Sequence, residues 1–206
     1  MKMAEKYGFV YFAAGIHAQE CASAELSELD SIASLFQHEK CCAIGEIGLE
    51  YHYDCAPKEK QLAFFEEQVR LSKEYDLPVI VHDREAHGDT LEILKKYRPE
   101  GVLHCFSGSV ELAKEILRLG MYIGLGGAVT FKNAKKPVEV AGAIPSDRLL
   151  LETDCPYMTP VPFRGQRNDS TYIAYTAEFI ADIRKTDTQE LINTATENAK
   201  TLFKLR

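Results

Sequence analysis

Four apolar segments of the chain each carry, at or near their end, a side chain that could ligate a metal ion. The four side chains are Glu46, His82, His104 and Asp154, within residues 43–51, 77–82, 101–104 and 149–154. Together they form the mixed imidazole and carboxylate donor set that zinc, manganese and magnesium hydrolases use. A single histidine or acid of this kind is more often a hydrogen-bonded core residue. Four in one repeated pattern favour a shared site for a divalent metal ion.

The same segments are predicted to be β strands that alternate with helices. Apolar runs predict strands over residues 9–14, 41–47, 78–82, 102–104, 121–124 and 148–152. Apolar residues at three- and four-residue intervals predict helices over about residues 24–37, 57–76, 86–97, 109–120, 135–143, 171–184 and 188–203, the last with a capping box at Thr186 and Gln189. Strands that alternate with helices form a parallel sheet. The carboxyl ends of such strands share one edge, where α/β enzymes place their active sites.

These elements predict an incomplete TIM-barrel-like α/β fold in a single domain over residues 1–206. A closed (β/α)8 barrel has eight strands in about 250 residues, whereas this chain of 206 residues supplies about six parallel strands. The missing units would leave unpaired edges on the strands at residues 9–14 and 148–152, and such edges invite pairing with another chain. We therefore expect a homodimer through these edges, or N-terminal residues that cover them.

Composition limits the class of protein and its partners. With 46% hydrophobic and 27% charged residues, the chain has the balance of a globular protein. It has neither a run of about 18 apolar residues nor an N-terminal signal core, so we expect a cytoplasmic protein with no membrane partner. Its six cysteines include no CxxC pair and are expected to be reduced thiols. The net charge of −7 argues against a broad basic surface for nucleic acid, so any such contact should be confined to a local pocket that bound cations make positive.

Six short motifs follow one another in a recognisable order. They are GIH at residues 15–17, GEIGLEY at 45–51, PVIVHDREA at 78–86, HCFSGS at 104–109, LLLETDCPY at 149–157 and PFRGQRN at 162–168. With these motifs the chain resembles, from about Phe9 to the C-terminus, the TatD family of metal-dependent deoxyribonucleases. Members of that family are TIM barrels. The number and order of the motifs make the resemblance specific.

The resemblance implies roles for individual residues. Glu46, His82, His104 and Asp154 would be metal ligands, with Glu46 as the bridge between two ions and Asp154 beside the attacking water as the second catalytic residue. A carboxylate in that place can take the proton of the water. His17 and Arg164 would contact the substrate, which the resemblance implies is DNA or another phosphodiester.

The chain departs from the family pattern at one important place. Family members open with a strand that carries an HxH pair, and this sequence contains no HxH. We therefore expect one tightly bound divalent ion (Zn, Mg or Mn), held by Glu46, His82 and His104, and a second site that is weak or lost. A smaller departure is Glu50, where the family usually has Asp.

Three functions remain open at this stage. The first is hydrolysis of DNA phosphodiester bonds by metal-activated water. The second is an amidohydrolase that acts on another small ester or amide, because the same ligands polarise either bond. The third is a truncated, non-catalytic relative that keeps the fold and serves binding, for which the missing HxH is the evidence.

Overall fold

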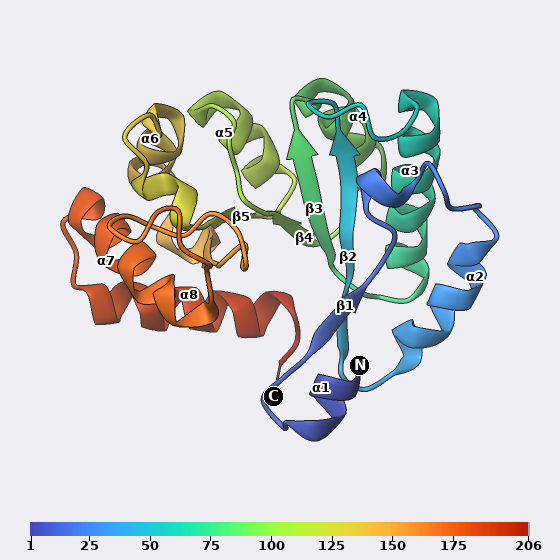
Figure 1. Ribbon diagram of the computed structural model, residues 1–206, viewed down its shortest axis with the longest axis horizontal. Coiled ribbons are helices and arrows are strands. Elements are labelled where there is room, and N and C mark those ends of the chain that lie inside the picture. The colour runs from blue at the N-terminus through green and yellow to red at the C-terminus, as the bar shows by residue number, and fades with distance from the viewer. Residues whose placement is uncertain (206) are drawn as a thin grey trace. The chain divides into compact units, whose positions relative to one another are not determined.

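The computed structural model describes residues 1–205 (Figure 1), and these residues divide into two compact units. Unit 1 consists of Met1–Val102 together with the C-terminal residues from Leu202 onward, and unit 2 consists of Leu103–Thr201. The described residues form six β strands that alternate with helices along the chain, as the sequence predicts. The expectation of a single domain over residues 1–206 stays a prediction.

Unit 1 is built around three parallel strands in the order β1-β2-β3. Its elements are α1 (Lys2–Lys6), β1 (Phe12–Ala14), the 3-10 turn η1 (Ala18–Glu20), α2 (Glu28–Ala33), η2 (Ser34–Gln37), β2 (Cys41–Glu50), α3 (Lys58–Glu74), β3 (Val79–Arg84), α4 (His87–Tyr97) and the start of β4 (Gly101–Leu103). Ala14 of β1 is level with Ile44 of β2, and Ile44 with Val79 of β3. The three strands therefore run in one direction, and their carboxyl ends lie at one edge.

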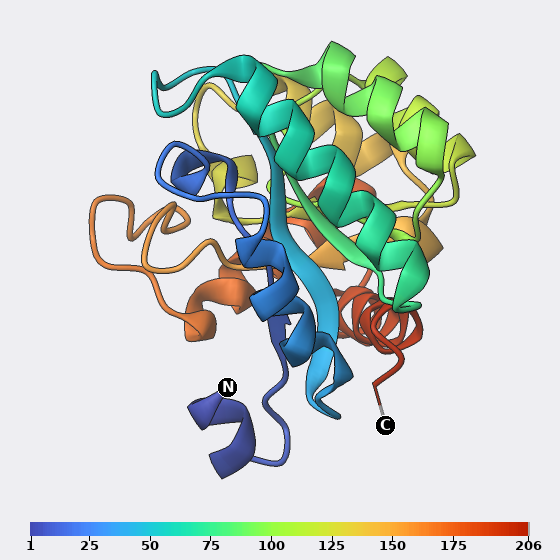
Figure 2. The same cartoon turned by 90° about the vertical axis from the view of Figure 1, so that its right-hand side faces the viewer.

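Helix α3 covers β2 and supplies much of the core of unit 1 (Figure 2). It begins directly after Pro57, whose fixed φ suits the start of a helix. Phe64, Phe65 and Val69 are each at most 1% exposed. Burial of side chains of this size stabilises the fold by about 1.5–3 kcal/mol each. The packing of these side chains fixes β2, and with it the polar residues at its far end.

Strand β2 is longer than the sequence predicts and contains an irregularity. The predicted strand ends at residue 47, but β2 continues to Glu50, so Glu46 lies within the strand and not at its end. The register with β3 shifts between Ile44 and Ile47. Gly48 has φ +140°, and a Cβ atom there would lie 2.0 Å from the backbone oxygen of His82. Only glycine permits this close approach of the two strands.

Unit 2 contains the parallel pair of β5 and β6 with helices around it. Its elements are α5 (Val110–Arg118), β5 (Tyr122–Leu125), η3 (Gly127–Thr130), α6 (Lys135–Ala143), η4 (Ser146–Arg148), β6 (Leu149–Leu151), η5 (Ser170–Tyr172), α7 (Ile173–Arg184) and α8 (Thr188–Leu202). Ile123 of β5 is level with Leu149 of β6. The amide of Asn198, on α8, donates to the backbone oxygens of Ser146 and Leu149 at 2.8 Å, which fixes the start of β6.

Some predicted boundaries are wrong for local reasons. The strand predicted over residues 9–14 begins only at Phe12, and Phe9 is 83% exposed. The helix predicted over residues 24–37 begins only at Glu28, because the Glu28 carboxylate accepts the Glu25 N–H and holds a turn there, and it consists of α2 followed by the 3-10 helix η2. At the start of α8, the carboxylate of Asp187 accepts the Glu190 N–H at 3.0 Å, so the cap is Asp187 and not Thr186.

None of the helices within residues 1–205 has the length and apolar character that crossing a membrane requires.

Candidate metal centre

A carboxylate and two imidazoles meet at the carboxyl ends of the strands of unit 1. Glu46 lies in β2, His82 in β3, and His17 between β1 and η1. The Oε1 atom of Glu46 is 2.9 Å from Nδ1 of His82 and 3.3 Å from Nε2 of His17. One potential ligand atom from each residue lies within 4.8 Å of the others. Glu46 and His82 supply a carboxylate and an imidazole of the kind that hold a divalent transition metal such as zinc, and the His17 ring lies beside them.

The backbone before His17 is held by a buried glutamine from α3. The Ile16 N–H donates to Oε1 of Gln68 at 2.7 Å, and Nε2 of Gln68 donates to the Ile16 oxygen at 3.0 Å. Gln68 is 1% exposed, so no water competes for these groups. The position of His17 therefore depends on a contact with a residue far away in the sequence.

The hydrogen bonds of His17 indicate which of its nitrogens carries the proton. The Gln19 N–H donates to Nδ1 of His17 at 3.2 Å. Because Nδ1 accepts this bond, the neutral ring carries its proton on Nε2, the atom that faces Glu46. In this tautomer His17 is a hydrogen-bond donor rather than a metal ligand. An N–H donor on His17 is compatible with the predicted contact between His17 and the substrate. That contact stays a prediction.

Glu50 is a site residue that sequence reasoning missed. It is 1% exposed, and its Oε2 lies 3.2 Å from Nε2 of His82. In the sequence, Glu50 stands out only as a departure from the family pattern. The strand predicted from the sequence ends at residue 47, so no alternation pattern placed Glu50 beside His82; the structure shows that β2 continues to Glu50.

In unit 2, His104 follows β4 and is paired with a carboxylate that was not predicted. Its Nδ1 lies 3.4 Å from Oε2 of Glu152, whose Oε1 accepts the Cys105 N–H at 2.7 Å. A Cβ atom at Gly124 or Gly126 would come within 3.1 or 3.3 Å of the Glu152 side chain. Because glycine has no side chain, these two positions leave space for the Glu152 carboxylate.

The other two predicted residues lie in the loop after β6. The Asp154 backbone oxygen accepts the Tyr157 N–H at 2.7 Å and closes a turn. Arg164 is exposed, and its guanidinium carbon stands 3.8 Å from the centre of the Phe131 ring. The structure thus brings Glu46 and His82 together within unit 1, while His104, Asp154 and Arg164 belong to unit 2. The expectation that all four ligands form one site stays a prediction.

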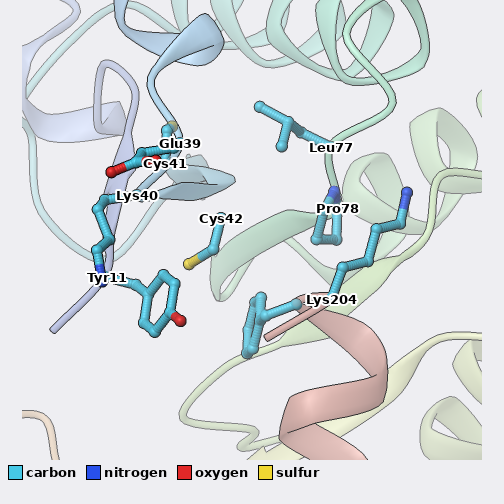
Figure 3. A pocket seen from close by; sticks show the side chains of 9 residues that line it. Tyr11, Glu39, Lys40, Cys41, Cys42, Leu77, Pro78 and Lys204 are labelled. Atoms are coloured by element: carbon cyan, nitrogen blue, oxygen red, sulfur yellow. The ribbon is translucent and has the colours of Figure 1, made fainter. Parts of the chain in front are cut away.

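A cavity of about 520 Å³ in unit 1 lies at the opposite edge of the strands (Figure 3). Tyr11, Cys41 and Pro78, which are among its lining residues, directly precede or begin β1, β2 and β3. Glu46, His82 and His17 lie at the carboxyl edge of the same strands. This cavity is therefore not part of the candidate metal centre.

Comparison with known proteins supports a metal-dependent hydrolase. The family described as TatD related DNase matches residues 1–204. The chain is 48% identical to YabD of Bacillus subtilis, named as an uncharacterized metal-dependent hydrolase, over all of this chain and 82% of that one. It is similar to the crystal structure of YjjV, a TatD homologue from Escherichia coli, with a TM-score of 0.93 and 34% identity over 100% of this chain and 81% of that chain.

A second solved structure is the TatD family hydrolase of Entamoeba histolytica, with a TM-score of 0.86 and 25% identity over 100% of this chain and 80% of that chain. These similarities confirm the predicted TIM-barrel-like α/β fold and the predicted family.

Proposed function

The chain belongs to the TatD related DNase family of metal-dependent hydrolases, and we propose that it hydrolyses phosphodiester bonds of DNA with metal-activated water. The observation that carries the proposal is the Glu46 carboxylate, which has one imidazole nitrogen at 2.9 Å and another at 3.3 Å from a single oxygen. A divalent metal ion, when bound, supplies Lewis-acid activation of water and of a phosphoryl oxygen. Glu46 and the Nδ1 atom of His82 would hold it, with His104 and Asp154 as the further ligands that the family implies.

The side chains of this protein take the remaining roles in the proposal. Asp154 accepts the proton of the attacking water, as a carboxylate near a lowered-pKa water can. His17, whose Nε2–H faces Glu46 in this structure, would turn that N–H to an oxygen of the scissile phosphate when the substrate binds, because the Gln19 N–H already occupies Nδ1. Arg164 contacts a neighbouring phosphate with a guanidinium group that suits two oxygens at once. These contacts confine DNA to a local pocket, in keeping with the net charge of −7.

The proposal is tested with end-labelled single-stranded DNA and protein that has been stripped of metal and reloaded with Mg²⁺, Mn²⁺ or Zn²⁺. We expect cleavage only after metal is added. Glu46→Gln keeps the shape of the side chain but removes its charge, and it should lower the cleavage rate at least about 100-fold. The matched control is Glu74→Gln on the exposed face of α3, which should cleave at the wild-type rate.

Two results would contradict the proposal, and each identifies another function. Metal-dependent turnover of small esters or amides without cleavage of DNA would identify an amidohydrolase. Bound metal without turnover of either substrate class would identify a non-catalytic relative.

A further inference from the structure

Glu50 is a buried acid with no role in the mechanism proposed above. Its two carboxylate oxygens have different partners. Oε1 accepts the backbone N–H groups of His52 at 2.8 Å and Tyr53 at 3.2 Å. Oε2 lies 3.2 Å from Nε2 of His82. With the residue only 1% exposed, water does not compete for either oxygen.

The backbone of Glu50 is fixed as firmly as its side chain. Its N–H donates to Oε1 of Gln61 at 2.8 Å, and its oxygen accepts from Nε2 of Gln61 at 3.0 Å. Gln61 projects from α3 and is 2% exposed. The carboxylate of Glu50 is therefore presented to His82 in one orientation, set by the packing of α3 on β2.

The other ring nitrogen of His82, Nδ1, faces the Glu46 carboxylate of the candidate metal centre. Nδ1 of His82 is 2.9 Å from Oε1 of Glu46. A neutral imidazole has one N–H and one lone pair. Each nitrogen of His82 therefore faces a carboxylate, and Glu46 is the nearer of the two. A metal ion beside Glu46 would need the lone pair of Nδ1, so the proton of the neutral ring would then belong on Nε2, where the buried Glu50 carboxylate can accept it. Carboxylates placed behind a metal-binding histidine fix its tautomer and its ring orientation in this way.

We propose that Glu50 is a positioning residue that holds the proton of His82 on Nε2 and thereby presents Nδ1 to a divalent metal ion. This inference rests on the metal site of the proposed function but not on DNA as its substrate. Its test therefore reads metal affinity and tautomer, and it gives an answer whether or not the protein cleaves DNA.

The decisive variant is Glu50→Gln, which has the same shape but only one oxygen. That oxygen is needed by the N–H groups of His52 and Tyr53, so the NH₂ group faces Nε2 of His82. A donor in that place moves the ring proton to Nδ1 and removes the lone pair that faces Glu46. We expect the Kd for Zn²⁺, measured by calorimetry on metal-free protein, to rise about 10- to 100-fold.

Three further measurements separate positioning from a general loss of structure. Glu50→Asp keeps two acceptor oxygens and should restore most of the affinity, with a Kd less than about tenfold above wild type. Glu85→Gln removes the charge of the exposed acid that pairs with His52 at 2.9 Å, and it should leave the Kd unchanged. In zinc-loaded wild-type protein, ¹⁵N NMR should show the His82 proton on Nε2.

A zinc-loaded wild type with the His82 proton on Nδ1 would overturn the proposal without any variant. An unchanged Kd in a folded Glu50→Gln protein would overturn it as well. So would a Glu50→Asp protein that is folded but binds Zn²⁺ as weakly as Glu50→Gln, because the charge and both acceptor oxygens would then be present without effect.

Discussion

Replacing Gln68 by Leu should destabilise unit 1 by about 2–6 kcal/mol. The magnitude follows from two backbone groups of Ile16, its N–H at 2.7 Å from Oε1 and its oxygen at 3.0 Å from Nε2 of Gln68. Ile16 is 9% exposed and Gln68 is 1% exposed, so water cannot replace the lost partners. Each buried group left without a partner costs about 1–3 kcal/mol. The sum is a large part of the roughly 5–15 kcal/mol that stabilises a typical domain.

The assay is urea-induced unfolding followed by circular dichroism, with the free energy extrapolated to water. The control is Gln189→Leu on the exposed side of α8, where Nε2 donates to Oδ1 of Asn193 at 2.9 Å. Because water can replace that bond, the control should stay within about 0.5 kcal/mol of wild type. A loss below about 1 kcal/mol for Gln68→Leu would show that the glutamine does not hold the segment before His17.

Two further predictions rest on the structure, and two rest on the sequence. Gly48→Ala should destabilise the protein by about 1–3 kcal/mol and weaken Zn²⁺ binding, because its Cβ atom would lie 2.0 Å from the His82 oxygen; thermal unfolding and calorimetry measure both, and a neutral variant would refute the close approach. Burial raises the pKa of the Cys21 and Cys42 thiols to about 11, whereas Cys155 is exposed. Iodoacetamide at pH 8 should therefore alkylate Cys155 first, as peptide mass spectrometry would show, and early labelling of Cys42 would contradict this. Protein purified without chelator should contain one tightly bound divalent ion per chain by metal mass spectrometry, and two such ions would show that the missing HxH histidines have been replaced. Light scattering should detect a homodimer formed through open strand edges, and a monomer with its edges exposed would argue against it.

The amino-acid sequence alone determined the fold class and part of the candidate site. Apolar runs that alternate with amphipathic helices predict parallel strands whatever the details of packing, and α3 with its buried Phe64 and Phe65 confirms that pattern. Strand direction then makes neighbours of residues at the carboxyl ends of adjacent strands. For this reason Glu46 and His82 could be expected to lie near each other, and within unit 1 their side chains are 2.9 Å apart. That they bind a metal ion stays a prediction.

Only the tertiary structure decided which atoms of these residues face one another. Glu50 meets His82 across 32 residues of sequence, and Gln68 meets Ile16 across 52, so no local pattern contains either pair. The extension of β2 to Glu50 also depends on the approach of Gly48 to the His82 backbone, a contact between two strands. The tautomer of an imidazole depends on the hydrogen bonds at both of its nitrogens. Those bonds exist only after distant strands and helices have packed. The sequence could therefore name candidate ligands, but not the nitrogen atom that each histidine would present.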